Sequence, residues 1–244
     1  AQHVIEALDD RIHVVQVILD YGENRKKIFA RRIRRIGLIA FFGQLMFRFI
    51  IVPYLRLSSK DRKEELYKTY ARNRSQQPFP PVRHVDNINS AEGNQFLNSL
   101  DPTVVVVVSR RIISKRTLNR VKAKFINIHD GIVPRYRGLF GAYWAMVEND
   151  MENCGATVHF IDENLDTGTI IAQTNIRTRL TKEDNFFTYP LHQFASALPL
   201  LNQALLDIGN GRLSTQKTVL EVGKVRFVPT LWTYIMNMVR KGIK

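Results

Sequence analysis

Two apolar runs separated by a short polar helix constrain the fold of this chain more than any other feature. The first, "TVVVVVS" at residues 103–109, is almost purely valine, which favours a strand buried on both faces. The second, "KFINIH" at residues 124–129, follows a short helical piece around "SKRTLNRVKA". The order strand, crossover, strand favours parallel pairing. We therefore predict an α/β fold with a mostly parallel sheet flanked by helices.

The residues before these runs continue the same alternation. "AQHVIEALDD" at residues 1–10 has the spacing of an amphipathic helix, and "IHVVQVILDYG" at residues 12–22 is typical of a buried strand. A helix followed directly by such a strand leads us to expect a further strand upstream of residue 1. The proline-rich stretch at 74–85 predicts a loop that becomes a short strand, and Asn89 with Glu92 forms a predicted capping box for the next helix.

The second half of the chain predicts further alternation. We expect a helix near 139–149, strands at 156–162 and 169–176 around a turn, and a long helix that begins at Thr181 and stops at the glycines 209 and 211. A short strand at 224–228 and a final helix from Pro229 complete the chain. We predict one main domain over residues 1–211 and a short C-terminal extension, residues 212–244, packed on it.

Residues 25–55 combine a basic run with an apolar one. "RKKIFARRIRR" is followed by "IGLIAFFGQLMFRFIIVPYL", which approaches the roughly 20 apolar residues that cross a bilayer. Gln44, Arg48 and Pro53 interrupt it. We predict a helix buried within the protein and keep open an interfacial helix and, third, a membrane span. The basic run is either a solvated face or a site for acidic lipid or substrate phosphate.

Charge and cysteine usage narrow the class of partner. Thirty-six Lys and Arg against 22 Asp and Glu give a net charge of +14, which indicates anionic partners. The single cysteine, Cys154, excludes an intramolecular disulfide and a multi-cysteine zinc site, so that a reducing cytoplasmic setting is expected. The six histidines show no metal-ligand spacing, and we expect no metal.

Polar residues that could carry chemistry follow the predicted strands. Asn127 and His129 lie two residues apart, so a continuing strand projects both to one side, where an amide and an imidazole N–H suit an oxygen that gains negative charge. Asp166, in "DENLDTG", arrives from another strand end and can hold the imidazole or take up a proton. This set fits acyl transfer without a covalent enzyme intermediate. On spacing alone, a turn-forming Asn, a structural His and a tight Asp-Thr-Gly turn remain the alternative.

Two longer motifs add a family resemblance. "NIHDGIVPRYRG" at 127–138, followed by "GATVHFIDENLDTGTIIAQ" at 155–173, closely resembles the folate-dependent formyltransferases, which include the glycinamide ribonucleotide, methionyl-tRNA and sugar-nucleotide N-formyltransferases. The clear match covers roughly residues 100–176. The resemblance implies a Rossmann-like domain that moves a formyl group from 10-formyltetrahydrofolate to an acceptor amine.

The resemblance also assigns roles to residues of this chain. It implies that Asn127 and His129 stabilise the oxyanion of a tetrahedral intermediate and that Asp166 supports the histidine and assists proton transfer. The residues that it implies for folate recognition are Arg111, Ile112, Ile113, Ile161, Asp162 and Asp166. Arg135, Tyr136 and Arg137 are candidates for gripping acceptor phosphate or folate carboxylates, with a solvated basic loop as the alternative. We expect His159 to be a core histidine.

Three classes of amine could accept the formyl group. The methionyl-tRNA enzymes carry a further β-barrel domain, whereas the residues after Ile176 read mainly helical, so we expect no nucleic acid partner. An amino sugar nucleotide or other small anionic amine is the expected acceptor, with glycinamide ribonucleotide or methionyl-tRNA as the alternative. A non-catalytic folate-binding or membrane-associated protein is the second alternative. An anionic membrane surface contacted through residues 25–56, a membrane-peripheral location and a homo-oligomer are kept as candidates.

Overall fold

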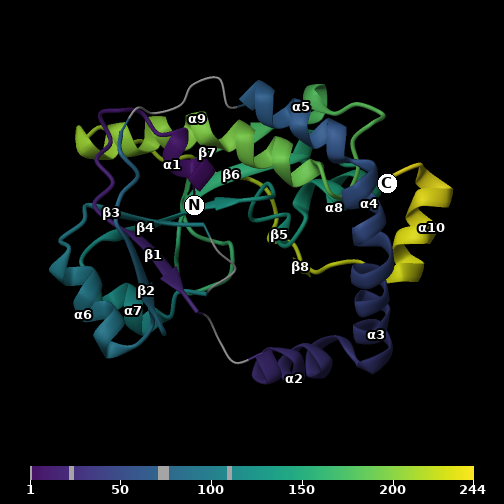
Figure 1. The fold of residues 1–244 in the computed structure, drawn as a ribbon, viewed down its shortest axis with the longest axis horizontal. Helices are drawn as coiled ribbons and strands as arrows, with labels where there is room; N and C mark the ends of the chain where they lie inside the picture. Colours follow the sequence, from purple (N-terminus) through teal and green to yellow (C-terminus); the bar gives the residue numbers. More distant parts are fainter. Residues whose placement is uncertain (1, 22–24, 71–76, 109–111) are drawn as a thin grey trace.

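The computed structural model describes residues 2–21, 25–70, 77–108 and 112–244, which form an α/β fold (Figure 1). The described residues contain three sheets. The central one has four strands in the order β3 (Val104–Val107), β4 (Lys124–His129), β6 (Gly155–Phe160) and β7 (Ile170–Asn175). The other two pair β1 (Val17–Asp20) with β2 (Val82–Val85), and β5 (Arg137–Gly138) with β8 (Val225–Arg226). The predicted fold class is confirmed.

Strand directions confirm one part of the predicted sheet and correct another. β3 and β4 are parallel, as the crossover through the helix at Lys115–Arg120 requires, and β1 and β2 are parallel as well. β6 runs antiparallel to β4, and β7 runs antiparallel to β6, so the central sheet is mixed. The connection 161–169 is too short for a parallel crossover, which needs a dozen or more residues. The strand expected upstream of residue 1 stays a prediction.

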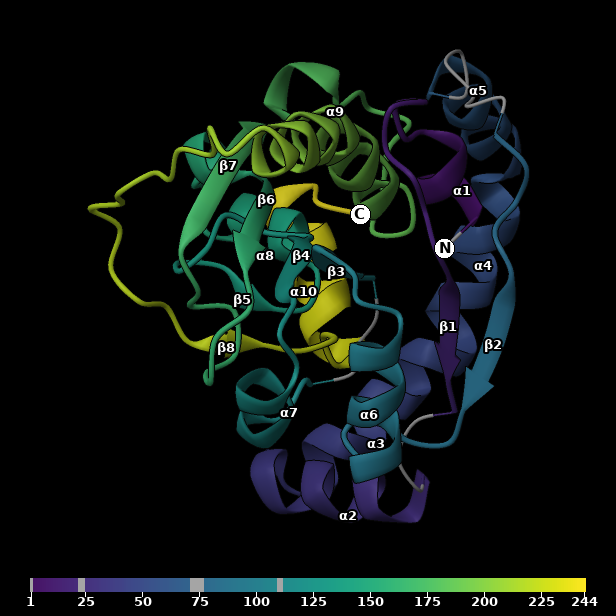
Figure 2. The same cartoon turned by 90° about the vertical axis from the view of Figure 1, so that its left-hand side faces the viewer.

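Helices cover both faces of the central sheet (Figures 1 and 2). Ile126 faces α9 (Tyr189–Gly209) and packs with its Ala197 and Leu201. Phe125, the next residue back, faces the other side and packs with Leu97 of α6 (Ala91–Ser99) and Leu118 of α7 (Lys115–Arg120). Neighbouring side chains of a strand point to opposite faces, so β4 is covered on both of them. The valine-rich β3 is only partly buried, which corrects the expectation of full burial.

A third hydrophobic cluster joins the C-terminal helix to the rest of the molecule. Tyr143 of α8 (Gly141–Val147) and Tyr234 of α10 (Leu231–Lys241) pack with Phe47 and Phe186. Asn237 donates a 2.9 Å hydrogen bond to the Tyr143 hydroxyl, and burial raises the pKa of that hydroxyl to about 12. The domain boundary at residue 211 stays a prediction. The remaining short helices are α1 (Gln2–Glu6), η2 (Met151–Asn153) and η3 (Arg177–Arg179).

Residues 25–70 form a helical arm along one edge of the fold (Figure 1). It consists of α2 (Arg25–Ile36), α3 (Leu38–Met46), the π-helical η1 (Phe47–Ile51), α4 (Val52–Ser58) and α5 (Lys60–Tyr70). The run Leu38–Ser58 is long and apolar enough to span a membrane by length and composition, yet only 22% of its most apolar stretch is buried. The expectation of a helix buried within the protein is therefore wrong: the helix lies on the surface.

Two helix starts differ from the predictions. Ser90, not Asn89, caps α6 by accepting the Gly93 N–H, whereas Asn89 accepts the Ser114 N–H and so joins two loops. α9 begins at Tyr189, eight residues after the predicted start at Thr181. Asp184 accepts hydrogen bonds from the Thr181 backbone and side chain, which holds the intervening residues in turns.

Candidate active site

Asn127 and His129 lie at the end of β4, and the structure brings Asp166 to them. The His129 Nδ1 atom is 3.4 Å from the Asp166 Oδ1 atom, and both side chains are more than nine-tenths buried. The two strand residues project to the same side because they are two positions apart. An amide, an imidazole and a carboxylate therefore meet at one edge of the central sheet.

Asp166 reaches this site although β6, the strand before its loop, runs antiparallel to β4. We expected Asp166 to arrive from a strand end, but the end of β6 lies opposite the start of β4, because the two strands are antiparallel. The loop folds back instead. Arg137 donates from Nε to the Leu165 carbonyl at 2.6 Å, and the Gly138 N–H donates to Asp166 Oδ2 at 2.8 Å. Asp166 itself has φ 53°, a left-handed conformation that few non-glycine residues adopt.

Gly168 lets the same loop approach its strand closely. A Cβ atom at this position would lie 1.7 Å from the Phe160 carbonyl oxygen. Only glycine leaves room for that approach, since a backbone oxygen cannot move aside as a flexible side chain can. The glycine of "DTG" is therefore required by the geometry of the loop that carries Asp166.

The His129 ring is held on both of its nitrogens. Nε2 lies 2.8 Å from the Tyr136 carbonyl, and a carbonyl only accepts, so Nε2 carries a hydrogen and donates it. Nδ1 faces the Asp166 carboxylate. Glycine is required at position 131 for this contact, because a Cβ there would lie 2.3 Å from the Tyr136 carbonyl oxygen and 3.0 Å from His129 Nε2.

His159 has a role at this site that was not predicted from the sequence. It lies opposite Asn127 in the β4–β6 register, and its Nε2 is 3.3 Å from Asn127 Nδ2. Nδ1 donates to the Phe160 carbonyl at 2.7 Å, which leaves Nε2 as the acceptor for the amide. Burial lowers the pKa of His159, and the neighbouring His129 lowers it further. His159 is a buried histidine, as expected, but it also orients Asn127.

Thr157 is a second supporting residue that spacing alone did not reveal. Its Oγ1 donates to the Gly131 carbonyl at 2.7 Å and accepts the Val133 N–H at 3.2 Å. Thr157 lies opposite His129 in the register and two residues before His159. Alternation along "ATVHF" is the signal that could have identified Thr157 and His159 as facing the same side.

The predicted folate-binding residues fall in two segments that the structure brings together. Ile113 and Ile161 pack in one cluster with Phe125. Ile112 is exposed, and its carbonyl accepts a 2.9 Å hydrogen bond from Asn89. Asp162 accepts from the Thr167 hydroxyl and the Asn164 N–H, which shapes the loop. Arg111 lies outside the described residues. Contact of these residues with a folate stays a prediction.

The three candidate acceptor residues make contacts within the protein. The Tyr136 side chain has no exposed surface and donates from its hydroxyl to Asp150 at 2.8 Å, so it does not face a ligand, which corrects the expectation for this residue. Burial raises the pKa of Tyr136 above its ordinary value. Arg135 pairs with Asp150 at 2.6 Å, and Arg137 holds the Leu165 carbonyl. Contact of the two arginines with an acceptor stays a prediction.

A metal ion at the candidate active site would need a group of side chains that could hold it. Within the part of the chain that the structure describes, no group of three or more His, Cys, Asp or Glu side chains has the arrangement of a metal site. Asn127, His129, Asp166 and the buried His159 thus form a cluster of hydrogen-bonding groups suited to stabilising charge and moving a proton.

Known proteins are similar to this chain over the region that contains the candidate active site. The family model described as "Formyl transferase" matches residues 56–194. A methionyl-tRNA formyltransferase of Finegoldia magna is 32% identical over 127 residues, which cover 50% of this chain and 41% of that protein. A GDP-perosamine N-formyltransferase of Brucella melitensis is 32% identical over 124 residues, which cover 50% of this chain and 47% of that protein. The chain spans less than half the length of these two relatives.

Solved structures show the same fold. The X-ray structure of a sugar N-formyltransferase from Shewanella aligns with a TM-score of 0.50 at 16% identity, covering 88% of this chain and 77% of that one. A 4-N formyltransferase from Francisella tularensis aligns with the same TM-score at 19% identity, covering 88% of this chain and 77% of that one. At these identities the likeness is one of fold.

Proposed function

This chain belongs to the formyl transferase family, and on that premise we propose that it is a one-carbon transferase that moves a formyl group from 10-formyltetrahydrofolate to an acceptor amine. The observation that carries the proposal is the approach of Asp166 to His129, at 3.4 Å, beside Asn127. These are the three residues that the resemblance assigns to catalysis.

The proposed reaction begins when the acceptor nitrogen attacks the formyl carbon and the carbonyl electrons move to its oxygen. The Asn127 amide has two hydrogens, and His159 accepts one, so the other is proposed to donate to the oxyanion. The amine proton passes to Asp166. The oxyanion electrons then re-form the carbonyl as the bond from the formyl carbon to the folate nitrogen breaks, and that nitrogen takes up the proton from Asp166.

His129 is proposed to stabilise the oxyanion with its ring. Both ring nitrogens contact the protein in this structure, Nε2 at the Tyr136 carbonyl and Nδ1 at Asp166. Donation from Nε2 to the oxyanion therefore requires the ring to release the Tyr136 carbonyl. In this scheme substrate binding and ring movement are coupled.

The proposed acceptor is an amino sugar nucleotide or another small anionic amine. Its support is the similarity to a GDP-perosamine N-formyltransferase and the net charge of +14, which favours a phosphorylated acceptor. The methionyl-tRNA formyltransferase of Pelotomaculum thermopropionicum is 36% identical over 134 residues, so methionyl-tRNA, and with it glycinamide ribonucleotide, stays the alternative acceptor. A cytoplasmic location is part of the proposal and rests on the single cysteine, which is a free, buried thiol.

A panel of amines incubated with 10-formyltetrahydrofolate tests the proposal. The panel contains nucleotide-linked amino sugars, glycinamide ribonucleotide and methionyl-tRNA, and the readout is formation of tetrahydrofolate together with the formylated product. Turnover of an amino sugar nucleotide alone supports the proposed acceptor. Folate binding without turnover of any amine would favour the non-catalytic alternative.

A further inference from the structure

The surface helix Leu38–Ser58 is fixed to the protein along one side. Phe47 is completely buried and packs against the rings of Phe186 and Tyr234, each at 5.0 Å between centroids. Gln44 donates to the Val228 carbonyl at 2.7 Å, and Leu55 belongs to the same hydrophobic cluster. A helix fixed along one side at Gln44, Phe47 and Leu55 differs from a spanning helix that lipid surrounds on all sides.

The π-helical turn keeps that buried side aligned. The residues that face the protein recur in steps of four: Gly43, Phe47, Ile51, Leu55 and Ser59. In a regular α-helix each step of four passes a full turn by about 40°, so the buried side would drift around the axis. The wider turn at Phe47–Ile51 takes up the extra rotation. The whole run therefore presents one side to the protein and the opposite side to solvent.

The solvent side of this run is mostly apolar, although the run also exposes Arg48 and Arg56. Six large side chains are each 60% exposed or more: Leu38, Ile39, Phe42, Phe49, Tyr54 and Leu57. The neighbouring α10 adds Trp232 and Val239, which are 45% and 75% exposed. α10 and α3 touch closely, because a Cβ at Gly43 would lie 2.2 Å from the Trp232 ring. We call these eight residues the apolar surface; it exceeds the scattered exposed residues that a soluble protein ordinarily has.

Basic residues border the apolar surface, and acidic ones are absent from its sequence. Seven of the 12 residues of α2 are Lys or Arg. α2 lies beside the start of α3 (Figure 1). The two helices contact each other through the rings of Phe29 and Phe41, whose centroids are 5.7 Å apart. Neither 24–60 nor 222–244, the segments that contain α2 to α4 and α10, includes an Asp or Glu in the sequence. Within these two segments the charged side chains are thus all of one sign.

We propose that the apolar surface and α2 together bind the surface of a bilayer that contains acidic phospholipid, with the run Leu38–Ser58 lying in the plane of the interface. Large apolar side chains enter the region between head groups and acyl chains, and neighbouring Lys and Arg attract the anionic head groups. The one-sided charge favours an anionic bilayer over a second copy of this chain, whose surface would carry the same positive charge. This inference goes beyond formyl transfer and does not depend on it.

Vesicle flotation with the full chain tests the proposal. The probes are phosphatidylcholine vesicles with and without phosphatidylserine, at low and at high salt. Two double variants test the two kinds of contact. Ile39→Ser with Leu57→Ser tests the apolar surface, and Arg34→Glu with Arg48→Glu tests the basic residues of α2 and η1. All four side chains are exposed. Matched controls are Val219→Ser and Lys217→Glu. They change exposed residues that belong neither to α2 nor to the run Leu38–Ser58.

The expected result is binding to the acidic vesicles at low salt, weakened at least tenfold in both double variants and by high salt, and unchanged in the controls. Melting temperatures equal to that of the unchanged chain show that the variants fold. Failure of the unchanged chain to bind acidic vesicles, or equal binding by the double variants, overturns the proposal. So does a dimer in sedimentation that Ile39→Ser with Leu57→Ser converts to a monomer, without vesicle binding. Resistance to extraction from cell membranes by alkaline carbonate would show a span instead.

Discussion

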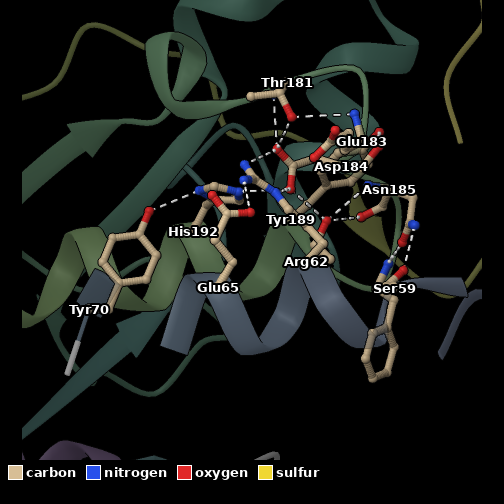
Figure 3. A network of polar contacts seen from close by, with 12 residues as sticks. Ser59, Arg62, Glu65, Tyr70, Thr181, Glu183, Asp184, Asn185, Tyr189 and His192 are labelled. Carbon is tan, nitrogen blue, oxygen red and sulfur yellow. Dashed lines mark hydrogen bonds and ion pairs between the residues drawn. The ribbon is translucent and has the colours of Figure 1, made fainter. Parts of the chain in front are cut away.

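Arg62 of α5 donates two hydrogen bonds to the carboxylate of Asp184, whose side chain has no exposed surface (Figure 3). The distances are 3.2 Å from Nε and 3.0 Å from the terminal nitrogen. His192 contacts the same carboxylate at 2.9 Å, and the Tyr70 hydroxyl lies 2.9 Å from the other nitrogen of that ring. This network ties the end of the helical arm to the start of α9.

Removing the arginine is expected to destabilise the fold. Arg62→Ala leaves the Asp184 charge buried with less compensation, and we expect a loss of about 3 kcal/mol in the free energy of unfolding. Urea denaturation measures it. The control is Arg177→Ala, which breaks an exposed pair with Glu152 and should change stability by no more than about 0.5 kcal/mol. Equal effects of the two variants would contradict a special role for the buried pair.

The same network predicts sensitivity to acid. Burial by itself would raise the pKa of Asp184, but the hydrogen bonds from His192 and Arg62 outweigh it and hold the pKa below its ordinary value. A lowered folded-state pKa stabilises the fold above the unfolded value, near 4, and this stabilisation is lost as the pH falls below it. Asp184→Asn should therefore flatten the dependence of stability on pH below about 4. An unchanged slope in thermal melts across this range would speak against the assignment.

The catalytic assignment predicts large losses of activity. His129→Ala and Asp166→Asn should each lower formyl transfer several hundredfold or more, as expected for an oxyanion or proton-transfer partner, while the fold survives. Steady-state kinetics with the acceptor found in the panel measures this. Asp86→Asn, at an exposed position, is the control and should leave turnover unchanged. Near-normal turnover in both active-site variants would refute the assignment.

His159 is expected to act through Asn127. His159→Phe removes the acceptor of the amide hydrogen, which costs about one hydrogen bond, so we expect kcat to fall about tenfold. The same substitution should have little further effect in an Asn127→Ala background, because the two residues contact each other. Kinetics of the double-mutant cycle measures this coupling. Additive losses would show that His159 contributes independently of Asn127.

Two glycines give a matched test of the loop that carries Asp166. Gly168→Ala places a methyl group against the Phe160 carbonyl and should destabilise the fold by about 1–3 kcal/mol and lower turnover. Gly209→Ala, at the end of α9 with no atom within 4 Å of its Cβ position, should be neutral or stabilise by up to about 1 kcal/mol. Thermal melting of both variants checks the difference, and a neutral Gly168→Ala would contradict the close approach.

Local patterns were enough for several elements. The valine run and "KFINIH" determined two parallel neighbours, because β-branched runs joined by a short helix have few other arrangements. The spacing of Asn127 and His129 determined that both project from one side of β4. The sequence of 38–58 likewise determined a long apolar helix but left open whether protein, lipid or water would surround it.

The tertiary structure decided what these patterns left open. β6 runs antiparallel to β4, so the loop of Asp166 reaches His129 only by folding back over β5, held by contacts distant in sequence such as Arg137 to Leu165. The same long-range packing brought His159 beside Asn127 and buried Tyr136, and it fixed one side of the surface helix against Phe186 and Tyr234. The sequence by itself determined most of the strands and helices and the identities of the candidate site residues, since these depend on near neighbours along the chain. The antiparallel direction of β6, the burial of individual side chains and the meeting of distant side chains depend on packing between segments that no local pattern encodes.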